Sequence, residues 1–128
     1  MTNVAKRRVS LVKLSGRRIL VLVAEHMVAR SIRDVLETQG AVVMLGPYSG
    51  PPHFDAVIVD REWARRSMVK TLFDAAVPVI GYTSDAGSFQ KRFAGATIIC
   101  KPAADSHFVD AIDSLPNRAN ELGNNVIC

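Results

Sequence analysis

The stretch Asp55-Ala-Val-Ile-Val-Asp60 decides the fold. Its apolar residues follow one another without polar alternation and are mostly β-branched, which is typical of a strand buried on both faces of a sheet. Four other apolar runs in the sequence have the same character, and each predicts a further strand. They are Ile19–Val23, Ala41–Leu45, Val77–Tyr82 and Ala96–Cys100.

Segments with the apolar spacing of helices lie between these strands. The segment His26–Gln39 carries one apolar stripe and ends at Gly40, a residue type that commonly terminates helices. Further helices are predicted over Glu62–Ala75, over Asp85–Phe93 and around Phe108–Leu115. This alternation of strands and helices predicts a parallel sheet with helices on both faces.

The connection between the second and third strands is different from the others. It contains Gly46-Pro-Tyr-Ser-Gly-Pro-Pro52, whose residues form turns and cannot make a helix of normal length. Parallel neighbours are usually joined by a crossover of about a dozen residues or more. We therefore expect the second helix to be shortened or missing.

Three polar side chains follow the predicted strands at their carboxyl ends, where open α/β sheets bind ligands. Asp60 follows the third strand, Thr83 the fourth and Lys101 the fifth. An aspartate can act as a nucleophile and form an acyl phosphate. A hydroxyl group can bond a phosphoryl oxygen, and an ammonium group offsets its charge. Each residue alone has an ordinary structural explanation, but together they indicate a phosphoryl site.

The segments Asp55–Asp60, Val77–Thr83 and Ile98–Pro102 resemble the receiver domain of two-component response regulators. The resemblance extends from about Arg17 to Leu115. It implies a flavodoxin-like (CheY-like), doubly wound sheet of five parallel strands in the order 2-1-3-4-5.

The resemblance also implies roles for single residues. Asp60 matches the phospho-acceptor, and Thr83, Lys101 and Pro102 match the positions that bind the phosphoryl group and switch with it. The family further implies a cis peptide bond between Lys101 and Pro102. Ile98 stands where receivers often carry a switching aromatic residue, so we expect the usual relay to be impaired.

The metal-binding acids of the family are absent from this sequence. Val23 and Ala24 occupy the positions of two acids that help to hold Mg²⁺, and Glu25 comes one residue too late. Mg²⁺ requires several oxygen ligands in near-octahedral geometry, so we expect no cofactor and a degenerate acid pocket. Asp60 and Glu25 are the remaining candidates for a metal site. Without the cation, we expect phosphorylation to be weak or absent.

The positive charge is concentrated at the start of the chain. Residues 1–18 hold six basic residues and no acid, whereas the rest of the chain has a net charge of −2. We expect a basic arm (1–16), a receiver-like domain (17–116) and a frayed polar tail (117–128). The arm is interpreted as a solvated segment, and binding of nucleic acid through it is the alternative.

The composition, 48% hydrophobic and 22% charged, is that of a globular domain. No apolar segment is long enough for a signal peptide or a membrane span. The two cysteines, Cys100 and Cys128, are not expected to form a disulfide framework, and Cys100 is expected to pack inside the fold. We therefore expect a cytoplasmic protein without membrane contact.

These observations together predict a stand-alone, atypical receiver in two-component (phosphorelay) signalling, and not an enzyme. It would bind a sensor histidine kinase or a downstream signalling protein through Asp85–Phe93, Ala96–Cys100 and Asp105–Leu115. Formation of a homodimer is a further alternative. Two modes remain, slow phosphorylation of Asp60 or constitutive binding, and we favour the second. A small-molecule-binding flavodoxin-like domain is an alternative, with the Gly46–Pro52 loop lining its site.

Overall fold

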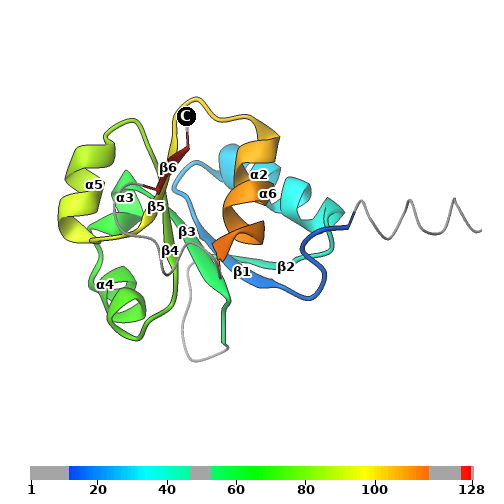
Figure 1. Ribbon diagram of the computed structural model, residues 1–128, viewed down its shortest axis with the longest axis horizontal. Coiled ribbons are helices and arrows are strands. Elements are labelled where there is room, and N and C mark those ends of the chain that lie inside the picture. Colours follow the sequence, from blue (N-terminus) through cyan, green and yellow to red (C-terminus); the bar gives the residue numbers. More distant parts are fainter. Residues whose placement is uncertain (1–11, 47–52, 116–124, 128) are drawn as a thin grey trace, which may run out of the picture.

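The computed structural model describes residues 12–46, 53–115 and 125–127 (Figure 1). Its strands are β1 (Arg18–Leu22), β2 (Val42–Leu45), β3 (Ala56–Asp60), β4 (Val79–Thr83), β5 (Thr97–Cys100) and β6 (Asn125–Ile127). Its helices are α2 (His26–Thr38), α3 (Arg61–Ala64), α4 (Ser67–Asp74), α5 (Ala86–Arg92) and α6 (Asp105–Asp113).

All the strands are parallel and form one sheet in the order β2-β1-β3-β4-β5-β6. The first five have the predicted order 2-1-3-4-5, and each lies within two residues of its predicted run. β3 is buried along its whole length, as its unbroken apolar pattern predicts. The doubly wound α/β fold is thus confirmed, with one strand more than expected.

Helices cover both faces of the sheet (Figure 1). Ile19 and Val21 of β1 face α2 and α6, whereas Leu20 and Leu22 face α3, α4 and α5. This alternation follows from the pleat of a strand, which turns successive side chains to opposite faces. Burial of each large aliphatic side chain contributes about 1.5–3 kcal/mol relative to exposure. The two apolar layers therefore fix the sheet and the positions of its carboxyl ends.

The prediction of one helix over Glu62–Ala75 is wrong, because the chain forms α3 and α4 there. Arg66 lies between them in an extended conformation (φ −81°, ψ 141°). Its backbone N–H donates to the carbonyl oxygen of Trp63 over 2.9 Å, and its guanidinium carbon lies 4.1 Å from the centroid of the Trp63 ring. These two contacts accompany the break that separates the helices.

The connection from β2 to β3 contains no helix over Gly46 and His53–Asp55. Residues 47–52, on which the prediction of a shortened or missing helix mainly rests, lie outside the described residues. The Lys101–Pro102 peptide bond is cis, as the family resemblance implies.

The ends of the described chain pack more closely than expected. Leu14 is fully buried, and its N–H donates to the carbonyl oxygen of Gln39 over 2.9 Å. Asn125–Ile127 pairs with β5, so the prediction of a frayed tail is wrong for these residues. Three residues within a polar segment are too few to show strand periodicity. No helix in the described part of the chain has the length and apolar character needed to cross a membrane.

Candidate functional site

The structure places the three predicted site residues at one edge of the sheet. Asp60 ends β3 and is in register with Tyr82 of β4. Thr83 ends β4, and its carbonyl oxygen accepts a hydrogen bond from the backbone N–H of Lys101 over 3.2 Å. Because β3, β4 and β5 are adjacent and parallel, their carboxyl ends bring these three residues to a common rim.

The carboxylate of Asp60 is held by two backbone groups. Its Oδ2 accepts a hydrogen bond from the N–H of Ala24 over 2.7 Å, and its Oδ1 accepts one from the N–H of Trp63 over 3.0 Å. The second bond makes Asp60 the N-cap of α3. Asp60 is only 6% exposed. Both carboxylate oxygens therefore accept hydrogen bonds, and the side chain links the exit of β1 to the start of α3.

Thr83 is buried, with an exposure of 3%, and its hydroxyl oxygen accepts a hydrogen bond from the backbone N–H of Asp85 over 3.1 Å. Asp85 in turn caps α5 by accepting from the N–H and the hydroxyl group of Ser88. These bonds, first the one from the Ser88 hydroxyl, lower the pKa of Asp85. Sequence reasoning missed this cap, although Asp is one of the residue types that favour the N-cap position of a helix.

Lys101 lies over Tyr82, with its Nζ 4.8 Å from the ring centroid. No salt bridge joins Lys101 to Asp60 within the described residues. Burial raises the pKa of the Tyr82 hydroxyl, and the negative charge of Glu25 raises it further. The ammonium group thus reaches the predicted rim, but its observed contact there is with an aromatic ring. Pro102, which the family resemblance predicts as a switch position, is exposed.

The residues at the exit of β1 do not fit a magnesium site. Val23 is buried and apolar, and Ala24 offers to Asp60 a backbone N–H, which is a donor and cannot bind a cation. Glu25 is exposed, and its charge acts on Tyr82. Within the described residues, no group of three or more His, Cys, Asp or Glu side chains is placed to hold a metal ion. Mg²⁺ needs oxygen ligands that this part of the chain does not assemble.

Cys100, the last residue of β5, is in a disulfide bond. The expectation that the two cysteines provide no disulfide is therefore wrong for Cys100. Alternation places its side chain on the face of the sheet opposite to that of Lys101. The other cysteine in the sequence, Cys128, lies outside the described residues.

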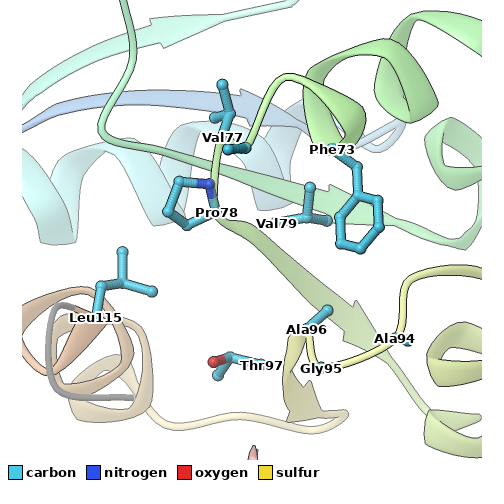
Figure 2. Close-up of a pocket in the computed structure, with 10 residues that line it drawn as sticks. Phe73, Val77, Pro78, Val79, Ala94, Gly95, Ala96, Thr97 and Leu115 are labelled. Carbon is cyan, nitrogen blue, oxygen red and sulfur yellow. The ribbon is translucent and has the colours of Figure 1, made fainter. Parts of the chain in front are cut away.

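A separate pocket lies at the opposite end of the sheet, near the amino ends of β4 and β5 (Figure 2). Its volume is about 210 Å³, and Phe73, Val79, Ala96 and Leu115 are among the side chains around it. The described residues that line it include no ionisable side chain. Since parallel α/β sheets bind their ligands at the carboxyl ends, this pocket is not the candidate site.

Comparisons with known proteins agree with the fold. No protein-family model matches the sequence, and no curated protein is similar enough in sequence to count as a relative. The receiver domain of the Francisella response regulator 1452 has a TM-score of 0.65 at 16% identity, covering 82% of this chain and 100% of that one. The CheY-like receiver domain protein from Methanospirillum hungatei JF-1 has a TM-score of 0.64 at 21% identity, covering 84% and 100%. Chemotaxis response regulator CheY4 of Vibrio cholerae has a TM-score of 0.61 at 14% identity, covering 81% and 99%.

Proposed function

We propose that this chain, which has the fold of a response-regulator receiver domain, is a signalling module that acts by binding a protein partner. In this proposal, Asp60 is phosphorylated weakly or not at all, and the domain presents its binding surface constitutively. The partner is a sensor histidine kinase or a downstream signalling protein.

The engagement of the Asp60 carboxylate carries the proposal. To accept a phosphoryl group, one carboxylate oxygen must attack phosphorus as the donor's leaving group departs. Both oxygens of Asp60 already accept hydrogen bonds from backbone N–H groups, of Ala24 and of Trp63. Attack by either oxygen would weaken one of these bonds, because an oxygen esterified to phosphorus is a poorer acceptor than a carboxylate oxygen. Losing a hydrogen bond to a charged, buried group costs about 1.5–3 kcal/mol.

The lack of acids at the exit of β1 adds a second barrier. A phosphoryl donor and a carboxylate are both negative, and a bound divalent ion normally offsets their repulsion. With Val23 and Ala24 at the exit of β1, the described residues supply no such ion site. Lys101 is the nearest basic group in the predicted set, and its ammonium group lies over Tyr82.

The expected contact surface consists of α5, β5 and α6, and the position of β6 changes how it can be used. One edge of β5 pairs with β4 and the other with β6. Its backbone is therefore not open for a partner strand to add to the sheet. We propose that the partner instead contacts the helices α5 and α6, which lie on opposite faces of the sheet on either side of β5.

Acetyl phosphate tests the proposal directly. The protein is incubated with acetyl phosphate and Mg²⁺, and its intact mass is recorded beside that of Asp60→Asn. We expect no phosphate adduct in either protein. An adduct in the wild type that is absent from Asp60→Asn would contradict constitutive binding and establish Asp60 as the acceptor.

Partner binding needs its own test, since an unphosphorylated protein could also be inactive. Tagged wild type and Asp60→Asn are used to isolate bound proteins from the source cells. We expect the same partner in equal amounts with both baits. A partner captured by the wild type alone would contradict binding that is independent of phosphorylation.

A further inference from the structure

A pocket of about 350 Å³ lies above the carboxyl ends of β1 and β2. Its lining combines Val23 and Ala24, which follow β1, with Trp63 and Arg66 of the α3–α4 region. α2 leaves β1 on one face of the sheet and α3 leaves β3 on the other. The pocket therefore lies beside the point between β1 and β3 where the winding of the sheet reverses, which is the usual ligand position in such folds.

The floor of this pocket is apolar. Val21, Leu22 and Val23 lie there with almost no exposure. Gly46, at the end of β2, comes so close to Leu22 that any Cβ at this position would clash with it, and that Cβ would lie 3.6 Å from the Trp63 ring. Where receivers carry acids, this chain thus has a small hollow with aliphatic and aromatic walls.

The charge at the rim of the pocket is positive. Arg66 holds its guanidinium group against the Trp63 ring, 4.1 Å from the centroid. It makes no salt bridge within the part of the chain that the structure describes. The described lining contains no acid, and the nearby carboxylate of Asp60 is bound to the N–H groups of Ala24 and Trp63. A planar guanidinium group is well suited to bind a carboxylate or a phosphate through two parallel hydrogen bonds.

A neighbouring pocket shows why this one is distinctive. It has about 210 Å³ between α3 and α5 and is lined by Arg61, Arg65 and Arg92. Asp85 lies in the same lining, so its positive charge is partly offset. The pocket at Trp63 combines an unopposed cation with a flat aromatic wall, and its volume is at the lower end of the range of about 300–1,000 Å³ for small-molecule sites.

We propose that this pocket binds a small aromatic molecule that carries one anionic group. The ring would lie on the apolar floor beside Trp63, and the carboxylate or phosphate would pair with Arg66. With Val23 and Ala24 in place of the acids that receivers carry, the lining lacks both the cation ligands and the negative charge that those acids would add, although the carboxylate of Asp60 stays beside it. This inference does not depend on partner binding.

Trp63 makes the test simple, since it is the only tryptophan in the sequence. Its indole N–H gives one recognisable signal in a ¹H–¹⁵N NMR spectrum. The probe is 1-naphthoate, with the uncharged 1-naphthamide as its matched control and adenosine monophosphate as the phosphate probe. We expect 1-naphthoate to shift the indole signal saturably, with a Kd between about 10 μM and 1 mM.

Two matched variants separate binding to Arg66 from a non-specific effect of net charge, and a third adds an acid to the lining. Arg66→Gln is expected to weaken binding of 1-naphthoate at least tenfold (about 1.4 kcal/mol). Arg65→Gln removes the same charge one residue away, from a side chain that lines the other pocket, and is expected to change the Kd less than about twofold. Ala24→Asp keeps Arg66 but adds a negative charge to the lining, and should also weaken binding. The spectra themselves show that each variant is folded.

The outcomes are distinct. Saturable binding that requires Arg66 supports the proposal, and tighter binding of adenosine monophosphate with the same requirement would identify phosphate as the preferred anion. No shift with either anion at millimolar concentration would overturn it. Equal binding of 1-naphthamide, or equal loss in Arg65→Gln and Arg66→Gln, would overturn it as well.

Discussion

The backbone N–H of Ala24 donates to Oδ2 of Asp60 over 2.7 Å, and this bond ties the exit of β1 to the end of β3. Ala24 therefore binds the carboxylate directly, at a position where receivers place an acid that binds a cation. The same aspartate also begins α3 through the N–H of Trp63. The residue that matches a phospho-acceptor is here a structural link between three elements.

Removal of the Asp60 carboxylate should destabilise the fold. Asp60→Ala loses both hydrogen bonds and the helix cap, and we expect the free energy of unfolding to fall by about 2–4 kcal/mol. Urea unfolding followed by circular dichroism measures this change. Asp60→Asn keeps one acceptor oxygen and should lose less than Asp60→Ala. Equal stability of wild type and Asp60→Ala would show that the two bonds contribute little.

An acid at position 24 should restore part of the receiver chemistry. Ala24 is exposed, so Ala24→Asp is expected to fold. With Asp60 it offers two carboxylates at the exits of β1 and β3, and we expect it to form an acetyl-phosphate adduct with Mg²⁺ present that the wild type does not form. Intact mass spectrometry with and without Mg²⁺ measures the yield. Ala24→Asn is the uncharged control, and a gain of the same size in that variant would argue against metal binding.

Tyr82 should titrate above the ordinary pKa of tyrosine. Burial is the larger cause of its raised pKa, and the charge of Glu25 is the second. In a Tyr48→Phe background, absorbance at 295 nm reports Tyr82 alone, and we expect a midpoint above about 10. Glu25→Gln should lower the pKa only in part. A midpoint unchanged by Glu25→Gln would mean that this charge does not reach the hydroxyl group.

The sign of the matching stability change follows from the raised pKa of Tyr82. The folded state favours the neutral hydroxyl group of Tyr82, and this preference stabilises the fold fully at a pH below the pKa that tyrosine has in the unfolded chain. The stabilisation is lost as the pH rises through the higher pKa that Tyr82 has in the folded protein. We therefore expect the free energy of unfolding to decline above about pH 10. Part of this decline should disappear in Tyr82→Phe, measured over the same pH range.

Loss of the Cys100 disulfide should loosen β6. A native disulfide typically contributes about 2–4 kcal/mol, and β6 pairs over only three residues with β5, the strand that ends at Cys100. We expect Cys100→Ser to increase amide hydrogen exchange at Val126 and Ile127 and along the paired edge of β5. A thiol reductant should have the same effect on the wild type and none on Cys100→Ser. Unchanged protection after reduction would show that hydrogen bonds alone keep the strand in place.

Most of the sheet could be predicted because its strands are local patterns. Runs such as Ala56–Val59 are apolar and β-branched throughout, and their order along the chain predicts the parallel topology. The break at Arg66 could not be predicted, because it accompanies a contact with Trp63 and interrupts no apolar periodicity. β6 was missed because three residues within a polar segment are too few to show the pattern of a strand.

The sequence predicted where the candidate site lies better than it predicted which contacts the site residues make. Asp60, Thr83 and Lys101 lie at adjacent strand ends, since strand order alone determines that placement. Their partners depend on how separate elements approach one another. Neither the bond from Ala24 to Asp60 nor the position of Lys101 over Tyr82 leaves a trace in the sequence. Whether Asp60 is phosphorylated stays a prediction.

The sixth strand also bears on how this protein behaves at high concentration. β5 consists of Thr97-Ile-Ile-Cys100, a short and strongly β-forming segment of the kind that promotes aggregation when its edge is bare. β6 pairs with that edge, so the edge strand of the sheet is β6 itself. A strand of only three residues is a poor template for further pairing. Truncation before Asn125 would therefore reduce solubility even where the rest of the domain keeps its structure.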